Sequence, residues 1–205
     1  MSKKVIIFLA EGFEEVEAIT PIDYLRRAGI EVKIAAIGLS AREKSPVVKG
    51  SHGIPIVADI TLEKLHEEKK LDPAAWDGVM VPGGLPGADN LAASGELGVF
   101  LKAMAASQKW VCAICAAPAR VLSPLGILAG KNFTCFPGEE EKVIAAGSAS
   151  AGAKWKQDRV VTDGNIITSR GAGTAGEFAC AIIAKLTSEA EAKKLAERVL
   201  LSAWC

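Results

Sequence analysis

The chain of 205 residues contains only two histidines, His52 and His66, and both precede Cys115. A hydrolase whose cysteine nucleophile is served by a histidine later in the chain is therefore excluded. The histidines also do not pair with the cysteines at metal-ligand spacing, so we expect no metal site. His66 falls in a charged helical segment, and His52 falls in a predicted loop.

The chain has no excess charge and no long hydrophobic run. Its 24 basic and 24 acidic residues give a formal net charge of zero, so we predict neither specific nucleic-acid binding nor attraction to anionic lipid. No segment is long enough to span a membrane. The apolar run at 5–10 is too short for a secretory signal, and acidic residues follow it directly. Five scattered cysteines form no disulfide framework. We therefore expect a cytoplasmic protein.

Apolar runs that are typical of buried strands alternate with amphipathic helices. We predict strands at 4–10, 31–37, 76–81, 110–114, 132–136 and 160–169, with the last one folded into a hairpin. Helices are predicted at 14–28, 62–70, 96–107, 174–186 and 188–204, and edge strands or a hairpin at 45–60. The inward face of the first helix is assigned to Val16, Ile19, Leu25 and Ala28. This alternation predicts one doubly wound α/β domain spanning residues 1–205.

In such folds the functional site forms beyond the carboxyl ends of the strands. Three predicted loops lie there, at 11–17, at 82–90, and at Cys115 with its following turn. Their convergence favours a single site.

Cys115 lies where a buried strand turns into a helix that begins Ala116-Ala117-Pro118. A sharp turn of this kind lifts one side chain clear of the sheet and directs free N–H groups at it, as in a nucleophile elbow. The helix dipole would favour the thiolate, which is the reactive form. The alternative is a buried cysteine that acts as a small hydrophobe. Cys112 lies inside the strand, which favours a core residue over a redox pair with Cys115.

Glu17 follows two other glutamates in the first turn of the first helix. Carboxylates are favoured at that end of a helix, so a simple charged cap is one interpretation. The other is a half-buried carboxyl with a raised pKa, able to carry a proton near neutrality.

Gly83 and Gly84 follow the strand at 76–81. They are either a tight turn or a pair of bare N–H groups that stabilise an oxyanion near the cysteine. Their spacing is not that of a dinucleotide-binding fingerprint.

Several segments, taken together and in order, resemble the ThiJ/PfpI superfamily, in the branch of the Parkinson-associated deglycase and its YajL-like bacterial members. The resemblance spans nearly the whole chain and rests on segments 11–18, 23–29, 81–84, 87–91, 113–118 and 168–175.

The resemblance implies a flavodoxin-like three-layer sandwich with a mostly parallel sheet, a homodimer and no cofactor. It implies that Cys115 is the reactive cysteine and that Glu17 is its protonated, hydrogen-bonded partner. The residues whose backbone lines the pocket would be Gly83, Gly84 and Ala116. Further candidate pocket residues are His52, which matches a family arginine from across the dimer, Arg27, and Phe136, which stands where the human-type branch has a histidine.

The function that follows is a slow glyoxalase or deglycase. Cys115 would form a hemithioacetal with a 2-oxoaldehyde, or with its early adduct on a protein or nucleotide, while Glu17 moves a proton. The alternative is an oxidative-stress sensor or chaperone whose Cys115 is oxidised to a sulfinate that Glu17 stabilises.

Overall fold

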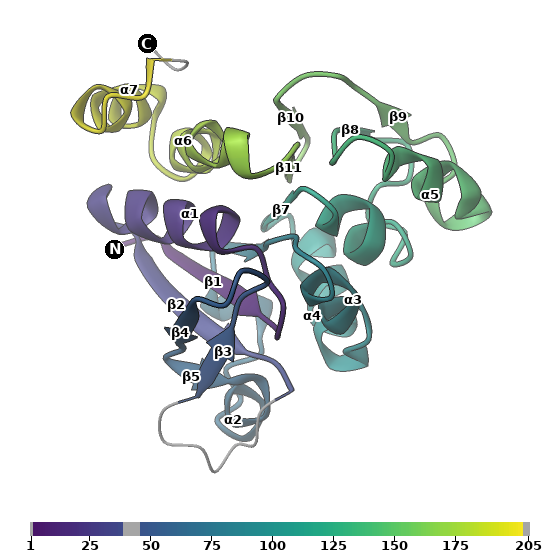
Figure 1. Ribbon diagram of the computed structural model, residues 1–205, viewed down its shortest axis with the longest axis horizontal. Helices are drawn as coiled ribbons and strands as arrows, with labels where there is room; N and C mark the ends of the chain where they lie inside the picture. Colours follow the sequence, from purple (N-terminus) through teal and green to yellow (C-terminus); the bar gives the residue numbers. More distant parts are fainter. Residues whose placement is uncertain (1, 39–45, 203–205) are drawn as a thin grey trace.

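The computed structural model describes residues 2–38 and 46–202. A central sheet of seven strands lies between two layers of helices (Figure 1). The strand order is β10-β11-β7-β6-β1-β2-β5, and every neighbouring pair is parallel except the antiparallel β10–β11 hairpin. The strands are β1 (Lys4–Leu9), β2 (Glu31–Ala36), β5 (Ile60–Thr61), β6 (Gly78–Val81), β7 (Trp110–Ile114), β10 (Val160–Asp163) and β11 (Ile166–Ser169). The predicted mostly parallel α/β sandwich is confirmed.

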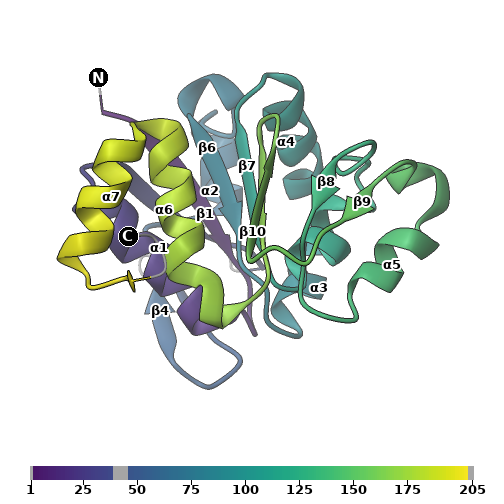
Figure 2. The ribbon, with the colours of Figure 1, turned by 90° about the horizontal axis from the view of Figure 1, so that it is seen from above.

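Alternate residues of the central strands pack into two separate hydrophobic cores, one on each face of the sheet. In β1, Val5 and Ile7 face one core, whereas Ile6 and Phe8 face the other, as the period of a strand requires. The first core is covered by α1 (Glu15–Arg27), α6 (Ala175–Leu186) and α7 (Glu189–Arg198), which lie together on one side of the sheet (Figures 1 and 2). On the other side lie α2 (Leu62–Glu67), α3 (Gly87–Ala92) and α4 (Gly95–Ala106). Near-continuous apolar strands are what a sheet buried on both faces needs.

Two small sheets stand outside the main one. The antiparallel hairpin of β3 (Val47–Lys49) and β4 (Pro55–Val57) confirms the hairpin expected at 45–60, although residue 45 lies outside the described residues. The strand expected at 132–136 is only β8 (Asn132–Phe133), and it pairs with β9 (Lys154–Trp155) instead of joining the main sheet. The short helix α5 (Glu140–Ala145) lies beside this second pair (Figure 2).

The inward face predicted for α1 was wrong for two of its four residues. Val16 and Ile19 are 48% and 37% exposed, whereas Leu25 is buried as predicted, in a stripe with Ala18 and Ile22. The assignment failed at the first turn because it took the apolar residues there as the ones that face inward. The glutamates at 15 and 17 are in fact buried, since distant N–H groups hydrogen-bond them.

The last helix is also shorter than predicted. It begins at Glu189, with Ser188 as the expected cap, but ends at Arg198 instead of near residue 204. Leu200 then adopts a positive φ of 58°, and the N–H of Leu201 returns to the carbonyl of Ala196. Cys205 lies outside the described residues.

Candidate active site

The carboxyl ends of β1, β6, β7 and β11 carry the loops that contain the candidate residues. The chain order reverses at β1, which has β2 on one side and β6 on the other. Ligand sites of open α/β sheets form at such a reversal. The sheet topology therefore places Glu17, Gly83 and Cys115 at a single edge.

Cys115 occupies a strained turn at the end of β7. Its φ of +64° is rare for a residue other than glycine and costs roughly 1–2 kcal/mol. Two backbone bonds hold the turn. The Cys115 N–H donates to the carbonyl of Ser169 at 2.9 Å, and its carbonyl accepts the N–H of Phe136 at 2.8 Å. The expected sharp turn is present, but only one π-helical turn, Pro118–Leu122, follows it in place of a regular helix.

Glu17 is 1% exposed and lies against the sulfur of Cys115, with which it shares a side-chain hydrogen bond. Its Oε2 accepts the N–H of Gly83 at 2.9 Å, and the backbone of Ala172 also donates to the carboxyl. Burial raises the pKa of Glu17 from 4.5 to about 7, and the nearby charge of Glu14 adds to the rise. The donors offset this only in part, so both protonation states are populated near neutral pH.

The ionisation of Cys115 differs from the expectation based on a helix dipole. Burial of the sulfur raises the pKa of the thiol above its ordinary range, and the charge and hydrogen bond of the Glu17 carboxylate raise it further. The N–H groups of Ala116 and Gly84 act in the opposite direction. The hydrogen bond between the thiol and the Glu17 carboxylate is a path along which the thiol proton can pass to Glu17.

The two glycines of the 83–84 turn are required by close packing. A Cβ on Gly83 would lie 2.7 Å from the Cβ of Cys115 and 2.8 Å from Oε2 of Glu17. Gly84 has a φ of +86°, and a Cβ there would collide with the backbone N of Glu14. These contacts bring the turn against both α1 and the elbow, with the Gly84 N–H directed at the sulfur.

His52 lies in the β3–β4 turn and is bound to Glu15. Its Nδ1 is 2.9 Å from Oε2 of Glu15, and its N–H donates to Oε1 at 2.7 Å. Burial opposes ionisation of Glu15, but the His52 side chain and the N–H groups of His52 and Ile54 outweigh it, so the pKa of Glu15 falls to about 2. The His52 ring is thus held by Glu15, not by Cys115, and 71% of the His52 side chain is exposed.

Phe136 and Arg27 lie in different places relative to the sulfur. Phe136 is beside the elbow. A Cβ added to Gly171 would lie 3.5 Å from the Phe136 ring and 4.0 Å from the sulfur of Cys115, so Gly171 lies between the two side chains. Arg27 is at the far end of α1, ten residues or roughly 15 Å from Glu17, where it pairs with Asp23 at 2.5 Å. Arg27 is therefore not brought together with Cys115 within one chain.

Sequence reasoning missed two contributors to the site, Ala172 and Arg120. Ala172 donates to Glu17. Glu14 caps α1 by accepting the Glu17 N–H at 2.7 Å, as its interpretation as a charged cap predicted. Arg120, in the turn after the elbow, forms ion pairs with Asp89 and Glu139. The acidic residue three positions before Glu17 was a usable signal for the cap, whereas the other two contacts join segments distant in sequence.

The described residues offer one group that brings three metal-ligating side chains within 4.8 Å: Glu14, Glu15 and His52. Both oxygens of Glu15 are already engaged by the hairpin, by N–H groups and by the His52 ring. The group therefore acts as a hydrogen-bonded anchor for the hairpin. No helix among residues 2–38 and 46–202 is long and apolar enough to cross a bilayer.

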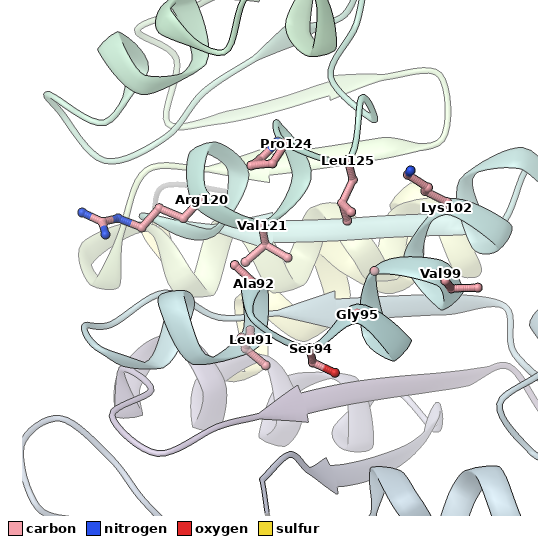
Figure 3. Close-up of a pocket in the computed structure, with 11 residues that line it drawn as sticks. Leu91, Ala92, Ser94, Gly95, Val99, Lys102, Arg120, Val121, Pro124 and Leu125 are labelled. Carbon is pink, nitrogen blue, oxygen red and sulfur yellow. The ribbon is translucent and has the colours of Figure 1, made fainter.

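A cavity of about 190 Å³ lies behind the elbow turn, between that turn and α3 and α4. Its lining is mainly apolar, from residues such as Leu91, Val99, Val121 and Leu125 (Figure 3). Neither Cys115 nor Glu17 lines it. This space is therefore separate from the cysteine–glutamate pair.

Comparison with known proteins connects this geometry to one family. Residues 3–185 match the model of the DJ-1/PfpI family. The chain is 39% identical to the Parkinson disease protein 7 homolog of Danio rerio, over 90% of this chain and 89% of that protein. It is 31% identical to a protein named deglycase from Pyrococcus abyssi, over 82% of this chain and 89% of that one. Oxidised DJ-1 of Toxoplasma gondii superposes with a TM-score of 0.84 at 34% identity, over 97% of this chain and 98% of that one.

Proposed function

The chain belongs to the DJ-1/PfpI family, and from that premise we propose that it is a cofactor-free, Cys115-dependent enzyme acting on 2-oxoaldehydes or their early glycation adducts. One observation carries the proposal: a buried carboxyl with a pKa near 7 is hydrogen-bonded to a cysteine in a strained elbow. A general base is most effective when its pKa lies near the working pH. The deglycase name of the Pyrococcus relative supports the substrate class.

The first step is addition of the Cys115 sulfur to the aldehyde carbon of a substrate such as methylglyoxal. The Glu17 carboxylate takes the thiol proton as the carbon–sulfur bond forms. The aldehyde oxygen becomes an oxyanion, which the N–H groups of Gly84 and Ala116, both directed at the sulfur, would stabilise. Return of the proton from Glu17 gives the neutral hemithioacetal.

The second step is an internal redox change that needs no external oxidant. Glu17 removes the proton from the former aldehyde carbon and delivers it to the neighbouring carbonyl carbon, while the hydroxyl proton of the first carbon passes to the oxygen of the second. The first carbon is thereby oxidised and the second is reduced. The product is a thioester of a 2-hydroxy acid on Cys115. Water hydrolyses it to lactate, in the case of methylglyoxal, and restores the thiol.

The same sulfur can act on an adduct in which an amine or thiol has already added to the aldehyde. Attack on that carbon forms the Cys115 hemithioacetal and releases the amine or thiol with its proton. The remaining steps are unchanged, so glyoxalase and deglycase reactions share one intermediate.

Phe136 bears on the rate. An apolar ring stands beside the elbow where a second acid–base group would shorten the proton path. A positioned acid–base group is typically worth about two to four orders of magnitude in rate. We therefore propose a slow enzyme in which Glu17 carries all the proton transfers.

The test is lactate formation from methylglyoxal by the purified protein. Turnover should vanish in Cys115→Ser and persist in Cys112→Ser, since Cys112 is a buried strand residue. Because Glu17 acts first as a base, kcat/KM should rise with pH through about 7. Turnover that survives in Cys115→Ser would overturn the proposal, and so would its absence from the parent protein.

A second candidate function is redox sensing, with a chaperone-like role switched on by oxidation. It is favoured by the same contact, because a protonated Glu17 can donate to an oxygen on sulfur. Two equivalents of peroxide would convert the thiolate to sulfinate with release of two waters. Mass spectrometry after mild peroxide should then find two oxygens on Cys115, in lower yield in Glu17→Leu. Equal yields in the two proteins would contradict the role of Glu17.

We also propose that the chain forms a homodimer in the cytoplasm through the outer face of α1. Val16 and Ile19 are exposed there, and Ile54, whose N–H bonds Glu15, is 51% exposed on the adjoining hairpin turn. Exposed apolar side chains that gather on one surface mark association sites. Sedimentation should show a dimer at micromolar concentration and a monomer for Val16→Lys/Ile19→Lys. A monomeric parent would remove this proposal.

A further inference from the structure

Arg120 connects three loops that surround Cys115. It lies in the turn that follows the elbow, and its own N–H donates to the carbonyl of Ala116 at 2.9 Å. Its Nη1 donates to both carboxylate oxygens of Asp89 at 2.7 and 2.9 Å. Its Nε and Nη2 donate to the two oxygens of Glu139 at 2.9 and 3.0 Å. One guanidinium thus makes two hydrogen bonds to each of two carboxylates, which lie 31 and 19 positions away in the sequence.

Each partner belongs to a segment that reaches the sulfur. Asp89 lies in α3, directly after Ala88, whose N–H donates to the carbonyl of Gly84. Glu139 closes the segment that begins at Phe136, through its N–H bond to the Phe136 carbonyl. The Phe136 N–H in turn bonds the Cys115 carbonyl. Arg120 therefore links the glycine turn, the elbow and the Phe136 segment.

The link matters because the two N–H groups aimed at the sulfur come from different loops. Ala116 belongs to the elbow, and Gly84 belongs to the turn that leads into α3. The α1 side of the glycine turn is fixed by the Glu14 N–H on the Gly83 carbonyl, at 3.0 Å. On the side of the elbow turn, the ion pair between Arg120 and Asp89 joins the two loops directly.

We propose that Arg120 is a positioning residue that keeps the N–H groups of Gly84 and Ala116 in register around the reacting atoms at Cys115. The inference rests on the proposed function for its kinetic consequence. Arg120 lines the cavity beside Val121 and Leu125, but Figure 3 shows its guanidinium pointing away from these residues. Only arginine offers the planar fork that both carboxylates need at once, which a lysine cannot reproduce.

A network that merely stabilises the fold would behave differently. Glu139 is the more buried partner, with 13% of its side chain exposed, whereas Asp89 is 53% exposed. Loss of Glu139 should therefore lower stability more than loss of Asp89. If Arg120 positions the donors, Asp89 is the partner that matters for rate, because it alone leads to Gly84.

The experiment compares Asp89→Asn, Glu139→Gln and Arg120→Lys with a matched control, Asp77→Asn. Asp77 is also ion-paired to a surface cation, Lys3, but lies at the opposite end of β6. Three readouts are taken: kcat and KM for methylglyoxal, the thermal midpoint, and the rate of Cys115 alkylation by iodoacetamide at fixed pH, followed by mass spectrometry of the Cys115 peptide.

Asp89→Asn and Arg120→Lys should lower kcat by about tenfold with little change in KM, which is less than the 10²–10³ lost when a whole oxyanion donor is removed. Glu139→Gln should lower the thermal midpoint more than Asp89→Asn but kcat less. Asp77→Asn should leave kcat and KM unchanged. If kcat instead follows the thermal midpoints, or Arg120→Lys retains full activity, the positioning role is overturned.

Alkylation separates this inference from the proposed function. If the parent protein shows no turnover, the proposed enzymatic function is refuted, and the positioning role of Arg120 is then tested by alkylation alone. Misplaced N–H donors stabilise the thiolate less, so Asp89→Asn and Arg120→Lys should slow alkylation by about three- to tenfold, with tenfold corresponding to one unit of thiol pKa. Unchanged alkylation in both variants would overturn the inference whether or not the protein turns over.

Discussion

Replacing Glu17 by glutamine should make the protein's stability less sensitive to pH. The folded protein holds the pKa of Glu17 near 7, chiefly through burial, against an ordinary value of 4.5. In the unfolded chain the carboxyl loses its proton near 4.5, whereas the folded protein keeps it until about pH 7. Folding then takes up a proton between these values, so the stability present below pH 4.5 is lost as pH rises towards 7 and beyond.

The size of the effect follows from the same two values. One unit of pKa corresponds to about 1.4 kcal/mol, so a rise from 4.5 to about 7 corresponds to an upper limit of roughly 3 kcal/mol by pH 8. Glutamine has no proton to lose and keeps nearly the same shape. Its altered hydrogen bonds to Gly83 and Ala172 add a constant offset, so the expected signature is a change with pH.

Urea unfolding followed by the fluorescence of the four tryptophans measures this directly. The difference in unfolding free energy between Glu17→Gln and parent should shift in favour of the variant by about 2–3 kcal/mol between pH 5 and pH 8. The same comparison of Glu17 with Glu17→Gln is repeated in a Cys115→Ala background, which removes the titration of the thiol. Parallel stability curves for the two proteins over this range would refute the buried, proton-holding Glu17 on which the proposed chemistry depends.

Three further substitutions test the site. Cys115→Gly should be more stable than Cys115→Ala by about 0.5–1 kcal/mol in urea unfolding, because glycine accepts the positive φ without strain; the reverse order would show that the turn is relaxed. Gly83→Ala should cost about 1–3 kcal/mol and most of the turnover, since its Cβ has no space beside Cys115; parent-like kinetics would contradict this packing. Because the pKa of Glu15 is lowered to about 2, the parent should have a higher unfolding free energy than Glu15→Gln above pH 4.5. In acid titrations this difference should fade as the pH falls towards 2. A difference independent of pH would show that the His52 contact is not made.

The layered fold was predictable because its pattern is local. Strands buried on both faces are apolar at successive positions, as β1 is from Val5 to Leu9, and the helices between them carry the longer period. The hairpin of β10 and β11 was marked by Asp163-Gly164-Asn165 at its turn. The strand expected at 132–136 failed because an apolar run does not specify a partner. Asn132 and Phe133 pair with β9, and the following residues turn back towards the elbow.

The candidate site was predictable as residue types but not as electrostatics. The positions of the motifs after predicted strands indicated that Glu17, Gly83 and Cys115 meet at the carboxyl ends of the strands. In the structure the three residues contact one another. The first turn of α1 was assigned wrongly at Val16 and Ile19, and a buried Glu17 was only one of two interpretations, because the donors that allow its burial, Gly83 and Ala172, are far along the chain. Thiol ionisation was misjudged for the same reason. The dipole argument used only the residues after Cys115, whereas burial of the sulfur and the Glu17 carboxylate set the direction.

The two proposed chemistries use opposite protonation states of one carboxyl. Addition to an aldehyde needs the Glu17 carboxylate as a base, and a sulfinate is stabilised by the protonated acid. With the pKa of Glu17 at about 7, both states are populated near neutral pH, so each proposed reaction would find the form that it needs. The reagent that reaches the sulfur first then decides the outcome. A thioester returns the thiol on hydrolysis, but a sulfinate does not. Under the two proposals, turnover and oxidation would therefore compete for Cys115, and each molecule oxidised would be lost to catalysis.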